Sequence, residues 1–447
     1  MTFESTELFR SELLDRLQSL TGGATPARWI VAFSGGLDST VLLHALANCA
    51  GDTPVVAVHI DHGLHPDSPA WASHCEVIAK RFGVAYVGLE VAVNEKAAAG
   101  LEAAARDARY SAFHELVQAN DCLLSAHHAD DQAETLLLNL MRGSGVSGIA
   151  GIGVSRVYGK GLLLRPLLDV PLQDLVSYAE AEQLEWVEDP SNRDTRFDRN
   201  FLRHEILPAL ASRWPAVAER LRRSAELVGE ASELLNDLAD VDRLAVGAGN
   251  RLGIDQLQAL SGLRQRNVLR RAIRCCGFPP PPGTRLQQIV DELIPARPDA
   301  QPLVAWRGVE VRRYRNELFI LPQATRTSPP AGAELRANGR PVAVGGELGT
   351  LQLLGTDNAG ISPDIAAAGL AIRFRDGGED IRVAGHESPQ KLKKLLQEAG
   401  ILPWMRPRLP LLYHGERLVA VANLWIDAQS TAQPGYVVEW HNAPLLK

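Results

Sequence analysis

The chain has 447 residues, which is more than one hydrophobic core usually serves, so two or three domains are expected. Its 46% hydrophobic and 22% charged content are those of an ordinary soluble globular protein. No apolar run approaches the length of a membrane span, and the first residues lack the basic and apolar parts of a signal peptide. A cytoplasmic protein without membrane contact is therefore predicted.

Net charge and cysteine spacing exclude two further classes. The formal net charge of −7 argues against a surface coated with nucleic acid, because phosphate contacts need clustered lysine and arginine. Any RNA site must therefore be local. The five cysteines form no Cys-x-x-Cys pair, so neither a zinc site nor a disulfide framework is predicted.

The segment from Trp29 to Thr40 changes character between Phe33 and Ser34. Residues 29–33 are typical of a buried parallel strand, and residues 41–46 of a helix packed on it. Between them, two glycines give a ligand access to backbone amides that open the helix, and a carboxylate beside a phosphate calls for a cation such as Mg²⁺. We interpret the loop as a nucleotide site, against the alternative of a plain glycine turn; its candidate ATP-binding residues are Ser34, Gly35, Gly36, Leu37, Asp38, Ser39 and Thr40, with Asp38 as the magnesium ligand.

This loop lacks the lysine of the common phosphate-binding P-loop. It resembles instead the Ser-Gly-Gly-x-Asp-Ser loop of the ATP pyrophosphatases. That resemblance implies cleavage of ATP between its α and β phosphates, with transfer of AMP to a carbonyl oxygen.

Further along the chain, residues 53–60 and 85–91 predict two more strands and residues 71–82 a helix between them. This alternation predicts an α/β fold with a parallel sheet. Because ligands gather at the carboxyl ends of parallel strands, His59, Asp61 and His62 are candidate ATP-binding residues. His62 could equally cap the end of its strand.

Residues 97–118 predict a helix that carries Arg106 and Arg109 on one face. Both could serve phosphates, although Arg106 also fits a solvated surface. The sequence Ala-Arg-Tyr resembles a family motif and favours Arg109 as a catalytic residue.

A fourth strand at residues 122–126 leads into a helix that we expect to begin near Ala129. One face of that helix would carry a histidine and three acids, at positions i, i+3, i+4 and i+7. Acids at a helix start can simply complement its dipole, but this group exceeds what that requires. The candidate catalytic residues here are His127, Asp130, Asp131 and Glu134.

Residues 142–148 form a glycine loop, and residues 189–208 mix arginines, asparagines and aromatics in a way that suits RNA or phosphate contact. Together with the segments at 34–39, 59–63 and 130–135, these stretches resemble tRNA(Ile)-lysidine synthetase over the first half of the chain. The candidate tRNA-binding residues in them are Arg142, Asn192, Arg199, Asn200 and Arg203.

The resemblance implies a fold, an activity and partners. The fold would be a parallel-sheet PP-loop ATP pyrophosphatase domain. The enzyme would use ATP and Mg²⁺ to attach L-lysine to C2 of the wobble cytidine of tRNA(Ile) with a CAU anticodon, through an adenylated cytidine, with release of pyrophosphate and AMP. The product would read AUA instead of AUG and accept isoleucine instead of methionine.

In the implied second step the lysine amine displaces AMP, and it cannot attack while protonated. Asp130, Asp131 and Glu134 are the candidates to bind that amine and accept its proton. A tRNA thiolase of the same superfamily and a non-catalytic tRNA-binding protein are the alternatives. The thiolase would need a cysteine pattern that this chain lacks.

The second half predicts a mostly helical middle domain and a small α+β C-terminal domain. Helices are expected through about residue 245 and over 252–274, then a hairpin at 307–320 and a linker at 322–333. The expected domains are residues 1–210, 211–325 and 334–447. Basic residues of both later domains are candidates for tRNA binding: Arg264, Arg270, Arg271, Lys391 and Lys394. The oligomeric state is not predicted, and a homodimer is left open.

Overall fold

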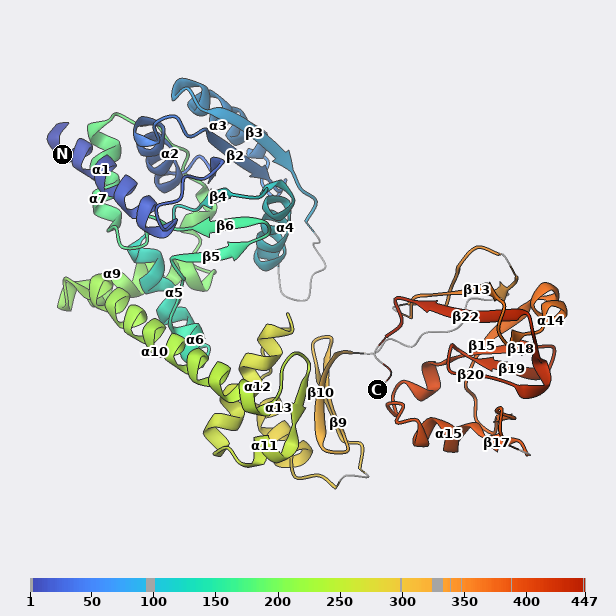
Figure 1. Ribbon diagram of the computed structural model, residues 1–447. Helices are drawn as coiled ribbons and strands as arrows, with labels where there is room; N and C mark the ends of the chain where they lie inside the picture. Colours follow the sequence, from blue (N-terminus) through green and yellow to red (C-terminus); the bar gives the residue numbers. More distant parts are fainter. Residues whose placement is uncertain are drawn as a thin grey trace. The chain divides into compact units, whose positions relative to one another are not determined.

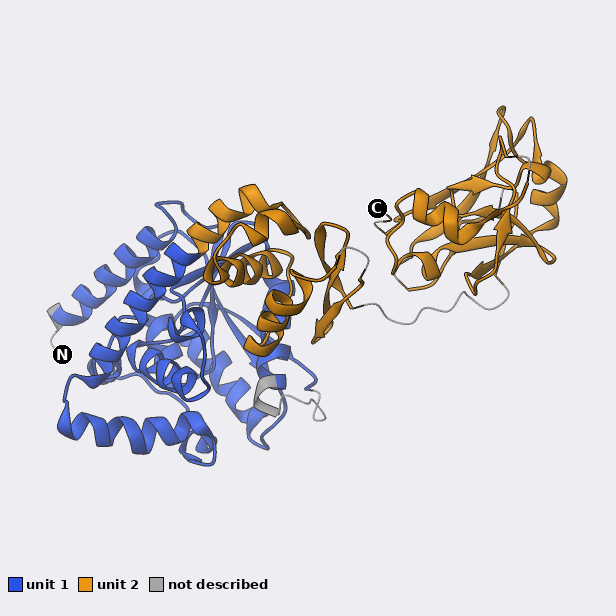
Figure 2. Cartoon of the chain, turned by 90° about the horizontal axis from the view of Figure 1, so that it is seen from below, with its two compact units in different colours: residues 1–235 blue, residues 236–447 orange. Residues whose placement is uncertain are grey.

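The computed structural model describes residues 3–93, 101–297, 300–323, 333–337, 339–346, 348–386, 388–444 and 446. These residues divide into two compact units, 1–235 and 236–447 (Figure 2). Within the described ranges, no helix combines the length and the apolar character needed to cross a membrane.

The first unit is built on a six-stranded sheet in the order β3-β2-β1-β4-β6-β5 (Figure 1). Its first five strands in that order run parallel, and β5 pairs antiparallel with β6 at the edge. The predicted parallel α/β sheet is confirmed, whereas β5 was not predicted. The strands are β1 Arg28–Ala32, β2 Val55–Asp61, β3 Ala85–Glu90, β4 Asp121–Leu124, β5 Ser155–Tyr158 and β6 Gly161–Leu164.

Helices cover both faces of this sheet because its buried strands have apolar side chains on both sides. Trp29 and Val31 of β1 pack against α1, α2, α3 and α7, and Ile30 between them faces the other way, toward Phe113 of α4. The helices of this unit are α1 Phe3–Leu20, α2 Leu37–Cys49, α3 Ser68–Arg81, α4 Leu101–Leu116, α5 Ala129–Met141, α6 Val146–Ile149, α7 Leu172–Ala181, α8 Asp198–Phe201 and α9 Leu207–Arg213.

Helix α10, Val217–Val246, begins in the first unit and ends in the second. After it, the predicted helical segment over 252–274 is confirmed for most of its length, as α11 and α12. It is wrong at its start, where residues 251–253 pair as strand β7, and it is interrupted before Ser261, the N-cap of α12. The predicted hairpin at 307–320 is confirmed by the antiparallel pair β9 and β10. This part contains α11 Ile254–Gln258, α12 Gly262–Cys275, α13 Gly283–Gln288, β7 Arg251–Gly253, β8 Leu303–Trp306, β9 Val309–Tyr314 and β10 Glu317–Pro322.

The C-terminal part is α+β, as predicted. Two five-stranded sheets, β11-β15-β18-β19-β20 and β12-β13-β22-β14-β21, enclose a shared apolar core, and a third sheet has two strands. Its elements are β11 Glu334–Leu335, β12 Val342–Ala343, β13 Thr350–Thr356, β14 Gly360–Ile361, α14 Pro363–Ala368, β15 Leu370–Phe374, β16 Asp380–Ile381, β17 Gln390–Lys391, α15 Leu392–Glu398, β18 Pro410–His414, β19 Arg417–Val421, β20 Trp425–Ile426, β21 Thr431–Ala432 and β22 Gly435–His441.

Candidate active site

The loop between β1 and α2 has the geometry of an anion cradle. Helix α2 begins at Leu37 with Gly36 as its N-cap, and no side chain caps its first amides. Those amides are therefore free of a side-chain acceptor from the cap residue and available to a phosphate.

Gly35 is the position in this loop that requires glycine. Its φ of +80° lies in the left-handed region, and a Cβ there would come within 2.8 Å of the Cys75 sulfur. Gly36 has a φ of −76°, which any residue can adopt. Helix α3, which carries Cys75, thus packs directly against the turn of the loop.

The hydroxyl groups of the loop mostly bond to the loop itself. Ser39 and Thr40 both donate to the Gly36 carbonyl oxygen, at 3.0 and 2.9 Å, and Thr40 is fully buried. Ser34 is exposed, and its hydroxyl lies 3.0 Å from that of Ser39. Ser34 is therefore the hydroxyl best placed for a ligand, while the other two hold the turn.

Asp38 is the acid of this loop, and one of its oxygens is left without a partner. Its Oδ1 is buried and accepts no hydrogen bond from the described residues, while Oδ2 lies 3.7 Å from His128 Nε2. Burial raises the pKa of Asp38 above its usual value, although the charge of His128 opposes the rise. A buried carboxylate oxygen without a donor is what a hard cation would complete, so this residue fits a magnesium ligand.

The end of β2 supplies three candidate ATP-binding residues in different surroundings. His59 is buried, and its Nδ1 donates to the Phe33 carbonyl oxygen at 3.0 Å, so it braces β1 against β2. Burial also lowers its pKa, despite that hydrogen bond. Asp61 accepts from the Gly63 amide at 2.7 Å. His62 Nδ1 is buried and has no hydrogen-bond partner among the described residues.

Helix α5 begins at Ala129, as predicted, and its N-cap is His128. The His128 imidazole accepts from the Asp130 amide, while Asp131 Oδ2 accepts from the His128 amide at 3.0 Å. His128 is 1% exposed and lies within 3.7 Å of three carboxylates, those of Asp38, Asp130 and Asp131. It joins the loop of residues 34–40, called the ATP loop from here on, to the acidic start of α5. His128 was not among the residues predicted from the sequence.

The surroundings of His128 change its proton affinity. Burial alone would lower the pKa of His128, but the carboxylates of Asp130, Asp131 and Asp38 together raise it above its usual value. Its neighbour His127 behaves in the opposite way, because burial lowers the pKa of His127 to about 4. His127 is therefore neutral near pH 7, with its Nδ1 2.6 Å from the Ser125 hydroxyl.

Two of the three acids on α5 are neutralised by arginines from a distant segment. Arg199 donates to Glu134 through Nε and to Asp131 through Nη2, both at 2.7 Å. Arg203 donates to Glu134 through Nε at 2.5 Å and to Asp131 through Nη2 at 3.1 Å. Glu134 is 1% exposed, so these contacts satisfy a buried charge.

Charge pairing also sets the proton affinity of Asp131. Burial would raise the pKa of Asp131, but His128 and Arg199 outweigh it and lower the value to about 2. Asp131 is thus ionised at every physiological pH.

Asp130 stands apart from this network. Its side chain is 33% exposed, and its Oδ2 accepts from the Leu172 amide at 3.0 Å. No arginine among the described residues pairs with it. The hydrogen bond with His128 lowers the pKa of Asp130 below its usual value, so it is an accessible anion beside the ATP loop.

Arg109 lies on α4, exposed to solvent, with its guanidinium 5.9 Å from the centre of the Tyr110 ring. Neighbouring groups partly desolvate its guanidinium although the side chain as a whole is exposed, and this desolvation, together with the charge of Arg106, lowers its pKa. Within the described part of the chain it forms no ion pair.

Comparison with known proteins decides the family. The PP-loop domain family matches residues 9–210, and the TilS substrate-binding and C-terminal substrate domain families match residues 252–319 and 370–440. The tRNA(Ile)-lysidine synthase of Alkalilimnicola ehrlichii is 45% identical over 429 residues, which cover 95% of each chain. The chain belongs to the tRNA(Ile)-lysidine synthase family.

A second member of this synthase family is also similar to the chain over most of its length. The tRNA(Ile)-lysidine synthase of Coxiella burnetii is 39% identical and covers 92% of each chain. Among solved structures, the U34-tRNA thiolase NcsA from Methanococcus maripaludis has a TM-score of 0.41 at 18% identity, covering 50% of this chain and 80% of that one. A likeness of that size has no bearing on function.

The candidate tRNA-binding residues of the first unit have partners within that unit. Asn200 donates to the carbonyl oxygens of Ser191 and Asp194, and the carbonyl oxygen of Asn192 accepts from His204 at 2.8 Å. Arg199 and Arg203 are held by the acids of α5. Arg142, 59% exposed, lies 3.6 Å from Asp198 and is the most exposed of the three arginines in the set.

The arginines of α12 divide into two groups. Arg264 and Arg271 form ion pairs with Asp242 and Asp240 of α10. Arg270 is exposed and has no acidic partner among the described residues, and it lies on the same helix stripe as two further arginines that the sequence analysis did not single out, Arg266 and Arg274.

In the C-terminal part, Lys391 and Lys394 are 69% and 67% exposed and lie near Asp380 and Glu398. Surface pairs of this kind are weak, so both lysines stay accessible to another charge.

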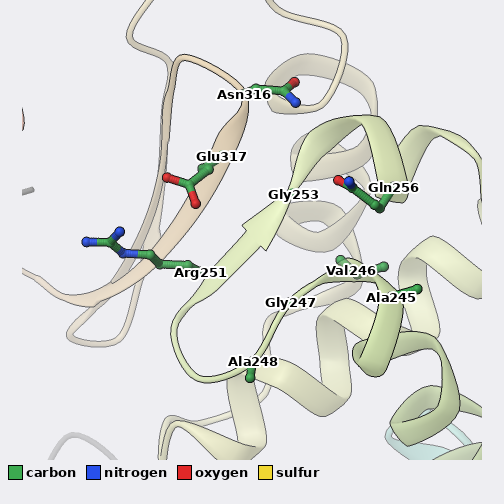
Figure 3. Close-up of a pocket in the computed structure, with 9 residues that line it drawn as sticks. All are labelled: Ala245, Val246, Gly247, Ala248, Arg251, Gly253, Gln256, Asn316 and Glu317. Atoms are coloured by element: carbon green, nitrogen blue, oxygen red, sulfur yellow. The ribbon is translucent and has the colours of Figure 1, made fainter. Parts of the chain in front are cut away.

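The second unit also has a shallow hollow of about 450 Å³ where α10 ends against β7 and β10 (Figure 3). Arg251, on its rim, stacks its guanidinium 5.1 Å from the Phe319 ring centre. Small residues and backbone form most of the lining, which comprises Ala245, Val246, Gly247, Ala248, Arg251, Gly253, Gln256, Asn316 and Glu317. Nothing in that lining matches the chemistry of the α5 region.

Proposed function

We propose that this enzyme attaches L-lysine to C2 of the wobble cytidine of tRNA(Ile) with a CAU anticodon, using ATP and forming an adenylated cytidine on the way. The observation that carries the proposal is similarity over 95% of the chain to a tRNA(Ile)-lysidine synthase. The ATP loop and the acidic start of α5, joined through His128, support it.

In the first step the C2 carbonyl oxygen of the cytidine attacks the α-phosphorus of ATP, and pyrophosphate leaves. The amides at the start of α2 and the Ser34 hydroxyl would bind the phosphates, and His62 has a free nitrogen for the nucleotide. Asp38 would hold Mg²⁺ through its unpartnered oxygen. When bound, Mg²⁺ neutralises charge on the triphosphate.

In the second step the lysine ε-amine displaces AMP from C2. The lysine ammonium first gives one proton to Asp130, which passes it to solvent. The neutral amine then attacks C2, the C2–O bond breaks and AMP leaves, and the cationic nitrogen so formed gives up a second proton to the same base. Asp130 is the accessible carboxylate beside the loop, and we assign it the binding of this amine.

Asp131 and Glu134 would then act mainly through Arg199 and Arg203. Two carboxylates matched by two guanidiniums carry no net charge, so they attract an ammonium weakly. We propose that they anchor residues 198–203 over the site and admit the lysine amine only where an arginine moves away.

A cytoplasmic location follows from the proposed substrates, and a homodimer stays a prediction that analytical ultracentrifugation would test.

The test of the proposal is incorporation of radiolabelled lysine into tRNA(Ile) transcript. We expect label in the CAU transcript with ATP, and none when ATP is omitted or when the wobble cytidine is replaced by uridine. Label in neither transcript, or equal label in both, would overturn the proposal.

A further inference from the structure

Four arginines gather around one tyrosine in the first unit. Arg106 and Arg109 lie on α4, Arg156 on β5, and Arg165 directly after β6. The guanidinium carbons of Arg106 and Arg156 lie 5.6 and 5.5 Å from the centre of the Tyr110 ring, as close as that of Arg109. These four residues are called the open arginines below.

The open arginines lie at the edge of the sheet that carries the chemistry. Strand β6 runs parallel to β4, so Arg165 follows its carboxyl end just as His127 follows that of β4. The charges of Arg165 and Arg106 act on His127 and help to lower its pKa. The group therefore borders the acidic start of α5.

Arg165 forms the buried base of the group. It is 6% exposed, its Nη1 donates to the Gly153 carbonyl oxygen at 2.5 Å, and its side chain hydrogen-bonds that of Tyr110, but its buried Nε has no partner among the described residues. Among the residues whose side chains are described, none of the open arginines forms an ion pair with a carboxylate. Burying a guanidinium without a counter-charge is costly, so the arrangement calls for an anion from outside.

The number and exposure of the charges indicate which anion. Arg106, Arg109 and Arg156 are exposed and Arg165 is buried, which gives three positive charges open to solvent and a fourth beneath the surface. One guanidinium is enough to pair a single carboxylate, whereas successive phosphates of a nucleic acid backbone need several charges. In single-stranded RNA recognition, splayed-out bases stack on aromatic rings and on arginine guanidinium planes, and this group offers both.

We propose that the open arginines bind backbone phosphates of the substrate tRNA beside the nucleotide being modified, and so position that nucleotide before Asp38 and Asp130. This inference rests on the proposed function, because it takes tRNA as the substrate. It adds Arg156 and Arg165 to the functional residues and gives Arg106 and Arg109 a shared role.

The test compares Arg106→Ala, Arg156→Ala and their double variant with Arg81→Ala in the full-length protein. Arg81 is 51% exposed and pairs with Glu185, and it ends α3 at the amino edge of the sheet, so it is a matched loss of charge. We expect each open-arginine variant to weaken tRNA binding about threefold to tenfold. The slope of log affinity against log salt should fall by about 0.7 to 0.9 per arginine, and Arg81→Ala should change neither.

Full-length tRNA(Ile) with one methylphosphonate linkage next to the wobble nucleotide locates the contact. Neutralising the contacted phosphate should weaken binding to the wild-type protein and should add little to the loss already seen in the double variant. If the loss of affinity from the methylphosphonate simply added to the loss from the double variant at every linkage flanking the wobble nucleotide, the assignment would be overturned.

Steady-state kinetics separate a phosphate from the carboxylate of lysine. We expect the KM for tRNA to rise in the variants while the KM for lysine stays the same. A higher KM for lysine with unchanged tRNA affinity would overturn the proposal in favour of a carboxylate site. Failure of the proposed function itself looks different, because wild-type protein would then bind tRNA with the expected salt slope yet incorporate no lysine.

Discussion

Two groups of arginines in the first unit differ in whether a carboxylate of the protein pairs with them. Arg199 and Arg203 are held by Asp131 and Glu134, whereas the open arginines face no described carboxylate. The acids divide in the same way: among the described residues Asp38 and Asp130 have no arginine partner, whereas Asp131 and Glu134 do. A charge that is matched internally holds the fold, and an unmatched charge is available to a substrate.

The largest expected effect is at an unmatched acid. Asp38→Ala should lower the rate of pyrophosphate release about a hundredfold or more, because it removes a main electrostatic group from the triphosphate site. Its thermal unfolding midpoint should stay near that of the wild type. Asp52→Ala, at an exposed acid outside the site, is the control. Near-normal pyrophosphate release by Asp38→Ala would contradict the role given to this loop.

The next largest effect is a loss of stability, expected at Glu134, an acid that is paired with two arginines. Glu134→Gln leaves two arginines with one carboxylate, and we expect it to cost about 3 kcal/mol of stability, which is about 6 to 12 °C in the unfolding midpoint of a unit of this size. Glu185→Gln, which breaks the exposed pair with Arg81, should cost less than about 1 kcal/mol. Equal midpoints for the two variants, measured by differential scanning fluorimetry, would show that the buried pairing of Glu134 stabilises the fold no more than an exposed ion pair does.

The features that the sequence could predict depend on residues that lie close together along the chain. The ATP loop and the start of α5 at Ala129 were predicted because strand, glycines, hydroxyls and acids follow one another within a few residues. His128 had a usable signal that the analysis passed over, since the residue directly before a helix start is its N-cap.

The partners of the acids could not be predicted. Arg199 and Arg203 lie 65 to 72 residues from Glu134 and Asp131, and residue type and spacing do not reveal a pairing at that distance. The same arginines therefore looked like tRNA contacts. Arg156 and Arg165 were passed over because their hairpin, β5 with β6, gives only a short and partly exposed apolar pattern.

In the second unit the same contrast separates arginines on one helix. Replacing Arg266, Arg270 and Arg274 by Ala should weaken tRNA binding and lower its salt slope by about 2 to 3. Replacing Arg264 and Arg271 should reduce stability instead and leave the slope nearly unchanged, because both serve acids of α10. Salt-dependent binding of tRNA checks both, and equal slopes for the two variants would show that pairing does not decide accessibility.

The smallest expected effect concerns the pKa of His128, which lies beside the carboxylates of Asp38, Asp130 and Asp131. His128 has a pKa raised above 6.5, so its stabilising charge is fully present below that pH and is lost as pH rises through the raised value. The unfolding midpoints of wild type and His128→Gln should therefore converge as the pH rises above about 6.5. In Asp130→Asn, nuclear magnetic resonance titration should give a lower pKa for His128; an unchanged pKa would show that Asp130 is not its partner.

The central claim is that an unmatched carboxylate, Asp130, receives the lysine amine after the cytidine has been activated. The most direct measurement follows pyrophosphate release and lysine incorporation separately in Asp130→Asn, over a range of lysine concentrations. We expect that Asp130→Asn still releases pyrophosphate but forms less product. Its KM for lysine should rise at least tenfold, which corresponds to about 1.4 kcal/mol of lost binding. If both steps fall together, or if lysine saturation is unchanged, Asp130 does not bind the amine and the claim is wrong.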